Sequence, residues 1–194
     1  MKFFKNPVTD IPDVFLPYGQ PQPFSTCINC DRHLLDDHVE YVVEKAIRQY
    51  SSFNSKDVIF EYAICMDCAL AIRNELSKES MQNIQQYLES TRMLSSRKQL
   101  IGDNNWNVQD WLSHCAISGE AIEEQQEYQI YGHCRGRQLI FSGMPYMVGG
   151  KAAEEMAGLL SEKTRDELGR FMDDHFGLPP ELKKIIQDKP FVML

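Results

Sequence analysis

Two pairs of cysteines, each with two residues between its members, constrain this chain more than any other feature of its sequence. Cys27 and Cys30 form the first pair, and Cys65 and Cys68 form the second. Two such pairs supply the four thiolates that a tetrahedral structural zinc site requires. The 34 residues between Cys30 and Cys65 are enough for a β-hairpin that brings the pairs together. We therefore expect one structural zinc ion, bound by these four cysteines.

The segments around the second pair predict two strands followed by helices. Residues 40–50 and 57–64 are rich in β-branched and aromatic side chains, and residues 51–56 have the composition of a turn. Residues 39–50 also fit an amphipathic helix, and that alternative stays open. Helices are expected over residues 69–76 and from Met81, the second with Ser80 as its N-cap.

This order of elements resembles a treble-clef zinc finger, in which a knuckle is followed by a hairpin and then by a helix that carries the last ligands. The resemblance covers residues 25 to about 76 and rests on the cysteine spacing and the element order. It implies a fold and a metal but no activity. A redox-active CxxC motif is the competing interpretation, although such motifs normally occur as a single pair.

The second half of the chain repeats the first weakly. Cys115 and Ser118 stand where the first two ligands stood, residues 147–150 stand for the last two, and residues 160–164 echo residues 76–80. Thr164 and Glu167 fit a capping box. We therefore expect an α+β protein of two tandem treble-clef-like units, the first zinc-bound. The second is expected to be degenerate and metal-free, with apolar packing in place of the metal.

The expected organisation has five parts. A proline-rich arm (1–24) packs on the body, and the zinc-binding unit (25–90) follows it. A polar connection (91–108) then leads to the degenerate unit (109–176). A short helix and an apolar tail (177–194) end the chain.

The second half also offers two other ligand sites. His114, Cys115, His133 and Cys134 contain four zinc-ligating side chains, but neighbouring residues on a strand point to opposite faces, so reduced and partly buried thiols are the favoured interpretation. Gly149, Gly150 and Lys151 at a helix start are suited to an anion. The phosphate-loop pattern is incomplete there, which favours a simple turn. Residues 115–120 are also similar to the opening of a U-box, over six residues only.

Composition narrows the functional classes. The net charge of −8 disfavours nonspecific nucleic-acid binding, and no apolar stretch is long enough to cross a bilayer. The first residues lack the apolar core of a signal peptide. A cytoplasmic location is therefore expected, where six cysteines indicate metal binding more than disulfides.

A closed four-thiolate zinc site leaves no open position for a substrate. The leading hypothesis is therefore a non-enzymatic module that binds another protein. One alternative is an enzyme of hydrolase or nuclease type with its site between the two units, using His33, His38, His114 and His133. In that alternative, His33 and His38 flank Asp36 and Asp37, although a solvated polar turn is the favoured interpretation of this cluster. The other alternative is a CxxC thiol redox protein.

Overall fold

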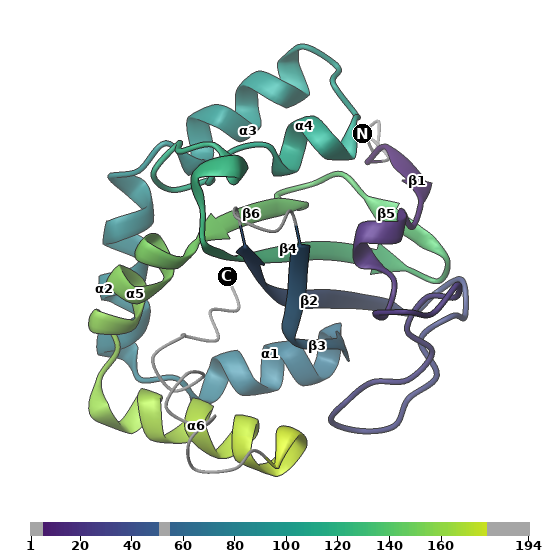
Figure 1. Cartoon of the computed structure of the whole chain (residues 1–194). Coiled ribbons are helices and arrows are strands. Elements are labelled where there is room, and N and C mark those ends of the chain that lie inside the picture. The colour runs from purple at the N-terminus through teal and green to yellow at the C-terminus, as the bar shows by residue number, and fades with distance from the viewer. Residues whose placement is uncertain (1–5, 51–54, 178–194) are drawn as a thin grey trace, which may run out of the picture.

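The two apolar segments expected as strands form a long antiparallel hairpin, β2 (Glu40–Tyr50) and β3 (Ser55–Cys65). The computed structural model describes residues 6–50 and 55–177 (Figure 1). Residues 41–47 of β2 are all buried, because both faces of this strand are covered. Burial on both faces produces an almost continuous apolar run, which explains why its sequence also fits a helix. The strand interpretation is confirmed.

One mixed α+β body surrounds an antiparallel sheet of six strands. Its main path runs β1-β5-β4-β2-β3, and β6 pairs with β4 beside β5. The remaining strands are β1 (Val8–Asp10), β4 (Glu127–Arg135), β5 (Gln138–Ile140) and β6 (Tyr146–Gly149). Residues 40–48 of β2 pair with residues 127–135 of β4, so the two halves of the chain share one sheet.

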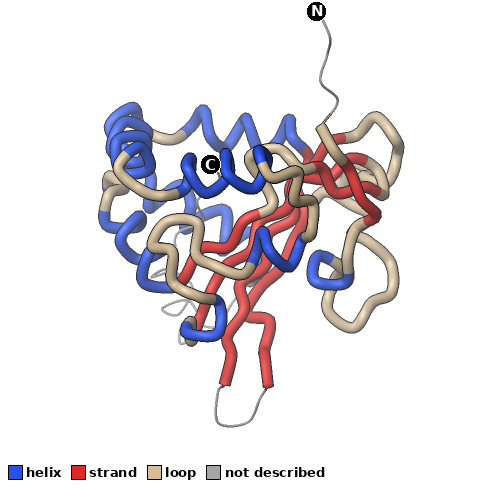
Figure 2. The backbone as a smooth tube through the Cα atoms, turned by 90° about the horizontal axis from the view of Figure 1, so that it is seen from above, coloured by secondary structure: helices blue, strands red, loops and turns tan. Residues whose placement is uncertain are grey.

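Six α-helices and two short 3-10 helices accompany the sheet in the described part of the chain. The α-helices are α1 (Met66–Glu75), α2 (Lys78–Glu89), α3 (Met93–Gly102), α4 (Val108–Leu112), α5 (Gly150–Gly158) and α6 (Glu162–Phe176). The 3-10 helices are η1 (Asp13–Phe15) and η2 (Ile122–Glu124). Figure 2 shows the long helices gathered on one side of the sheet and the N-terminal loop with η1 on the other.

The N-terminal segment closes the face of the sheet opposite the helices. Phe15 is fully buried against Gly132 of β4, where an added Cβ would lie 2.8 Å from the Phe15 ring. The Lys45 ammonium donates to the carbonyl of Leu16 at 2.7 Å and pairs with Glu61 at 2.9 Å. A buried lysine is tolerated because both of these partners satisfy its charge.

Three local expectations differ from the structure. Residues 91–108, expected as a polar connection, contain α3, whose Arg97 is buried and donates to the carbonyls of Trp111 and Pro145. Helices α2 and α6 begin earlier than expected, with Ser77 and Ser161 as N-caps.

The expected C-terminal helix and tail lie outside the described residues, apart from Gly177. No helix in residues 6–50 or 55–177 is long and apolar enough to cross a membrane.

Candidate metal centre

The first cysteine pair lies in a tight turn that the backbone closes on itself. The Cys27 amide donates to the Arg32 carbonyl at 2.9 Å, and the Asp31 amide donates to the Cys27 carbonyl at 3.0 Å. Asp31 has φ of 58°, a left-handed conformation that aspartate tolerates better than most residues. The turn therefore places the Cys27 and Cys30 thiols on one side, facing the end of β3.

The second pair lies where β3 passes into α1. Cys65 is the last residue of β3 and the N-cap of α1, and Cys68 is in the first turn of that helix. All four sulfurs, those of Cys27, Cys30, Cys65 and Cys68, lie within 4.8 Å of one another. No other comparable group of three or more His, Cys, Asp or Glu side chains occurs across residues 6–50 and 55–177. The expected zinc ligands are therefore brought together.

The sulfur geometry fits a tetrahedral zinc ion. Four sulfurs at the usual zinc–sulfur distance of about 2.3 Å form a tetrahedron whose edges are about 3.8 Å. The Cys30 and Cys65 sulfurs are 3.8 Å apart. Two N–H groups also donate to ligand sulfurs at 3.3 Å, from the backbone of Cys65 to Cys27 and from the Asn29 side chain to Cys68. These donors orient the sulfurs and stabilise thiolate charge.

The ionisation of the four thiols is linked to metal binding. Burial raises the pKa of Cys65, and it raises the pKa of Cys68 to about 12. At Cys27 burial acts in the same direction, but backbone N–H groups outweigh it and lower the pKa. Because neighbouring thiolates repel one another, all four ionise together only when a metal compensates their charge. Four sulfurs in this arrangement are the donor set that zinc prefers.

Polar contacts around the cysteine cluster involve side chains that the sequence does not single out. Arg32 pairs with Asp67 at 2.6 Å, joining the turn of the first cysteine pair to the helix of the second. Asn29 also lies 3.3 Å from the Nε2 atom of His175, in the last turn of α6. The position of Asn29 between two ligand cysteines was the only sequence signal for these contacts. The metal centre is therefore linked to the last described helix of the chain.

The backbone around Cys115 repeats the hydrogen bonds around Cys27. The Gly149 amide donates to the Cys115 sulfur at 3.3 Å, as the Cys65 amide donates to Cys27. The Ala116 amide bonds to the Met147 carbonyl, as the Ile28 amide bonds to Ala63. These bonds match Cys65 with Gly149 and, along the helix, Cys68 with Ala152. In this matching the third and fourth positions fall at residues 149 and 152, two residues beyond those of the expected window of residues 147–150.

A glutamine side chain fills the space beside Gly149. A Cβ added to Gly149 would lie 2.0 Å from Oε1 of Gln125, so the Gln125 amide occupies the space of a third thiol. Gln125 is buried, and its Nε2 donates to Glu120 at 3.3 Å. The expected apolar packing is present in this part of the fold, where Phe141, Tyr146 and Met147 are buried. At Gly149 itself a hydrogen-bonded amide fills the space, and Ala152 is also buried.

The alternative metal site of the second half is not brought together. His114 is exposed and lies 2.8 Å from the Ser113 hydroxyl, whereas His133 pairs with Glu40 at 3.0 Å. The Cys115 sulfur accepts backbone N–H groups, and burial raises the pKa of Cys134 to about 12. These four side chains thus have separate partners. The description of Cys115 and Cys134 as reduced, buried thiols fits the structure.

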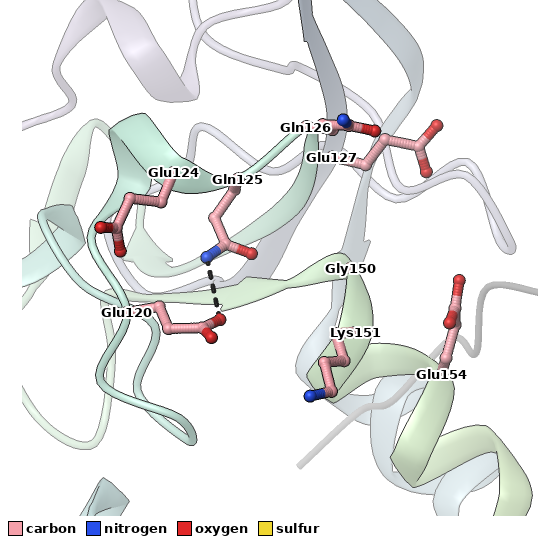
Figure 3. Close-up of a pocket in the computed structure, with 8 residues that line it drawn as sticks. All are labelled: Glu120, Glu124, Gln125, Gln126, Glu127, Gly150, Lys151 and Glu154. Carbon is pink, nitrogen blue, oxygen red and sulfur yellow. Dashed lines mark hydrogen bonds between the residues drawn. The ribbon is translucent and has the colours of Figure 1, made fainter.

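The surroundings of Gly149, Gly150 and Lys151 disfavour an anion. The Gly149 amide is already used by Cys115, which leaves one donor fewer for a phosphate. Gly150 and Lys151 line a surface pocket of about 590 Å³ with four carboxylates (Figure 3), those of Glu120, Glu124, Glu127 and Glu154. Glu127 is paired with Arg48, but the other three carboxylates still place an excess of negative charge around Lys151, which opposes phosphate binding.

The remaining histidines of the enzyme hypothesis lie on the surface. His33 and His38 are exposed, and His33 lies 4.0 Å from Asp36 across a solvated turn. None of the hydrogen bonds or ion pairs found in the described residues joins two of the histidines His33, His38, His114 and His133.

No protein-family model matches the chain, and comparisons with curated proteins and with solved structures find no significant match.

Proposed function

We propose that this chain is a zinc-stabilised protein-interaction module without enzymatic activity. The observation that carries the proposal is the complete set of four sulfurs within 4.8 Å, at Cys27, Cys30, Cys65 and Cys68. Four protein ligands leave zinc no position for a substrate or a reactive water, which is the arrangement of structural sites. Zinc in this role joins the turn, the hairpin and α1, and so presents a fixed surface. A reducing compartment such as the cytoplasm would keep the thiols available.

We infer further that the chain consists of two tandem treble-clef-like units related by duplication. The β2–β4 ladder supports this inference. Glu40 and Arg48 of β2 match Glu127 and Arg135 of β4 in sequence, and the ladder pairs Glu40 with Arg135 and Arg48 with Glu127. The same ion pair therefore occurs at both ends, at 3.7 Å and 2.6 Å. Such a self-complementary register is what a two-fold relation between similar units produces.

The alternatives are less compatible with the site. A redox CxxC motif at the second pair would require a depressed thiol pKa, whereas burial raises the pKa of Cys65 and Cys68. At the first pair the pKa of Cys27 is lowered, but its sulfur lies within 4.8 Å of both sulfurs of the second pair, as a shared metal requires and a separate redox pair does not. An enzyme between the units would require histidines that converge on one place, and their contacts are separate. The acidic net charge of −8 favours a protein partner over a nucleic acid.

Affinity capture with the full zinc-loaded chain tests the proposal. Captured proteins are identified by mass spectrometry, purified, and titrated calorimetrically against the wild type, Cys65→Ser and Cys134→Ala. We expect a purified partner to bind the wild type and Cys134→Ala alike, and to bind Cys65→Ser at least about tenfold more weakly because the zinc scaffold is lost. Failure to reconstitute any partner, together with a turnover activity that His33→Ala abolishes, would instead establish the enzyme alternative.

A further inference from the structure

Among residues 6–50 and 55–177, no strand pairs with the outer edge of β3 at its first residues. Within the part of the chain that the structure describes, β3 pairs only with β2. Ser55, Lys56 and Asp57 are exposed, and Val58 and Ile59 are half-buried. Figure 2 shows the two strands of this hairpin projecting beyond the rest of the molecule. A projecting edge strand presents backbone donors and acceptors that another strand can pair with.

The matching position in the second half carries an added strand. Arg48 pairs with Asp57 on β3, and its match Arg135 pairs with Gln138 on β5. By this register Asp57 and Val58 correspond to Gln138 and Leu139. The outer edge of β5 is occupied by β1, which places Thr9 opposite Leu139 and Asp10 opposite Gln138. The chain itself therefore shows what kind of segment this edge receives: a short, extended strand running antiparallel to it.

The other outer edges of the two hairpins are filled in matching ways. On β3 the Ala63 carbonyl accepts from the Ile28 amide, and on β6 the Met147 carbonyl accepts from the Ala116 amide. These two edges, at Ala63 of β3 and at Met147 of β6, are therefore occupied in the same way. The edge of β5 is occupied by β1, and its counterpart is the outer edge of residues 57–59 of β3. Apart from β2, no described segment is bonded to those residues.

The charges at this edge select the occupant. Asp57 is exposed, and no ion pair is found for it among the described residues; the guanidinium of Arg48 opposite it donates to Glu127 at 2.6 Å. If the β1 segment of a second copy paired here in the register of β1 with β5, it would place Asp10 opposite Asp57. Like charges directly opposite each other destabilise a strand pair. A segment with lysine or arginine at that place would be favoured instead.

We propose that residues 57–59 of β3 bind an extended segment of a partner protein by β-strand addition. That segment runs antiparallel to β3, with a basic residue opposite Asp57 and an apolar residue opposite Ile59, where β1 has Val8 in the matching register. Main-chain hydrogen bonds would provide the affinity, and the ion pair with Asp57 the specificity. This inference rests on the proposed function as a protein-interaction module and assigns its binding surface.

Two synthetic peptides test this assignment with the full zinc-loaded chain. One carries the chain's own β1 sequence, Pro-Val-Thr-Asp-Ile, and the other carries Pro-Val-Thr-Lys-Ile, in otherwise identical flanks. We expect the lysine peptide to bind about fivefold more tightly than the aspartate peptide at low salt, and Asp57→Lys to reverse this order. In amide NMR spectra, the largest shifts should lie at residues 56–59.

Proline at Val58 provides a second, independent variant. Its match Leu139 faces β1, so Val58→Pro should remove a main-chain donor from the outer edge and abolish peptide binding, while zinc content and circular dichroism stay unchanged. The proposal is overturned if Asp57→Lys leaves the peptide preference unchanged, if the NMR shifts lie elsewhere, or if the wild type is a dimer that Val58→Pro dissociates. Because the peptides are defined, a negative result here rejects only the assignment of residues 57–59 as the binding surface. The proposed function is tested separately by the capture experiment, in which a partner can bind through another surface.

Discussion

The side-chain oxygens of Ser80 and Thr164 lie 3.1 Å apart, where the first turns of α2 and α6 meet. Each helix start is capped partly by the other. The Ser77 amide donates to the Thr164 hydroxyl at 3.0 Å, and the Ser161 amide donates to the Ser80 hydroxyl at 2.8 Å. Ser80 and Thr164 are both fully buried. This exchange of caps joins the two halves of the chain away from the sheet.

Removing one of these hydroxyls should destabilise the whole fold. Ser80→Ala leaves the Ser161 amide without its acceptor in a buried place, which costs about 1–3 kcal/mol. Urea unfolding of the zinc-loaded protein measures this loss. Ser95→Ala, which removes an exposed hydroxyl of α3, is the matched control and should change the free energy of unfolding by less than about 0.5 kcal/mol. If Ser80→Ala lowered the free energy of unfolding no more than Ser95→Ala does, the shared caps would not contribute to stability.

The buried carboxyl of Glu44 should make stability fall as pH rises. Glu44 lies opposite Tyr62 and Tyr131 in the sheet and accepts a hydrogen bond from the Tyr62 hydroxyl. Burial raises its pKa from 4.5 to about 8, although the tyrosine hydrogen bonds act in the opposite direction. Between these two values the unfolded chain has released a proton that the folded chain retains. This contribution is therefore complete below pH 4.5 and lost by about pH 8, at up to about 1.4 kcal/mol per pH unit.

Glu44→Gln removes the titrating group and keeps the size of the side chain. Urea unfolding of wild type and variant at pH 5 and pH 8, with zinc in excess, tests the effect. Because the pH dependence of zinc binding is common to both proteins, it cancels in their difference. We expect the stability of the variant relative to the wild type to increase from pH 5 to pH 8. A constant difference would show that Glu44 ionises normally in the folded state.

The close contact between Gly149 and Gln125 predicts a coupled pair of mutations. Gly149→Ala forces the Gln125 amide from its buried position and should cost about 1–3 kcal/mol in unfolding free energy. In the background of Gln125→Ala the same change should cost much less, because the space is then free. Gly158→Ala has no heavy atom within 4 Å of the added methyl and serves as the control. Additive effects of the two mutations would contradict this account of the site.

The proposed duplication predicts that a metal site can be built into the second half of the chain. Ser118→Cys, Gly149→Cys and Ala152→Cys, combined with Gln125→Ala, place three thiols beside Cys115 at the matched ligand positions. Zinc content by mass spectrometry should rise to two ions per chain, and adding Cys115→Ser should reduce it again to one. A content that stays at one ion would mean that the matched backbone does not reproduce the ligand geometry.

The metal cluster and the central hairpin could be predicted from the sequence because their patterns reflect direct physical requirements. Two cysteines separated by two residues satisfy the geometry of one zinc ion, and β-branched residues bounded by turn residues favour strands. Helix α3 was missed because its buried residue is Arg97, whose terminal nitrogens donate to distant carbonyls, so that no apolar stripe marks the helix. Only the folded chain brings those carbonyls to it.

The contact between Gln125 and Gly149 could not be predicted for a similar reason. Gln125 looks like a surface residue in the sequence, and its position against Gly149 depends on η2 and β6 meeting in space. Cys65 matches Gly149, and not Met147, because residues 141–145 separate β5 from β6, whereas β3 is continuous and has only a register shift opposite Ala46 and Ile47 of β2. Insertions of this kind leave no mark in short sequence windows.

Zinc content per chain tests the central claim most directly. Inductively coupled plasma mass spectrometry on protein purified under reducing conditions should find one zinc ion in the wild type and in Cys134→Ala. It should find none in Cys65→Ser, whose thermal unfolding should also occur at lower temperature because metal binding contributes to folding. Wild-type protein that is folded without bound metal, and that forms a reversible disulfide between Cys65 and Cys68, would contradict the account.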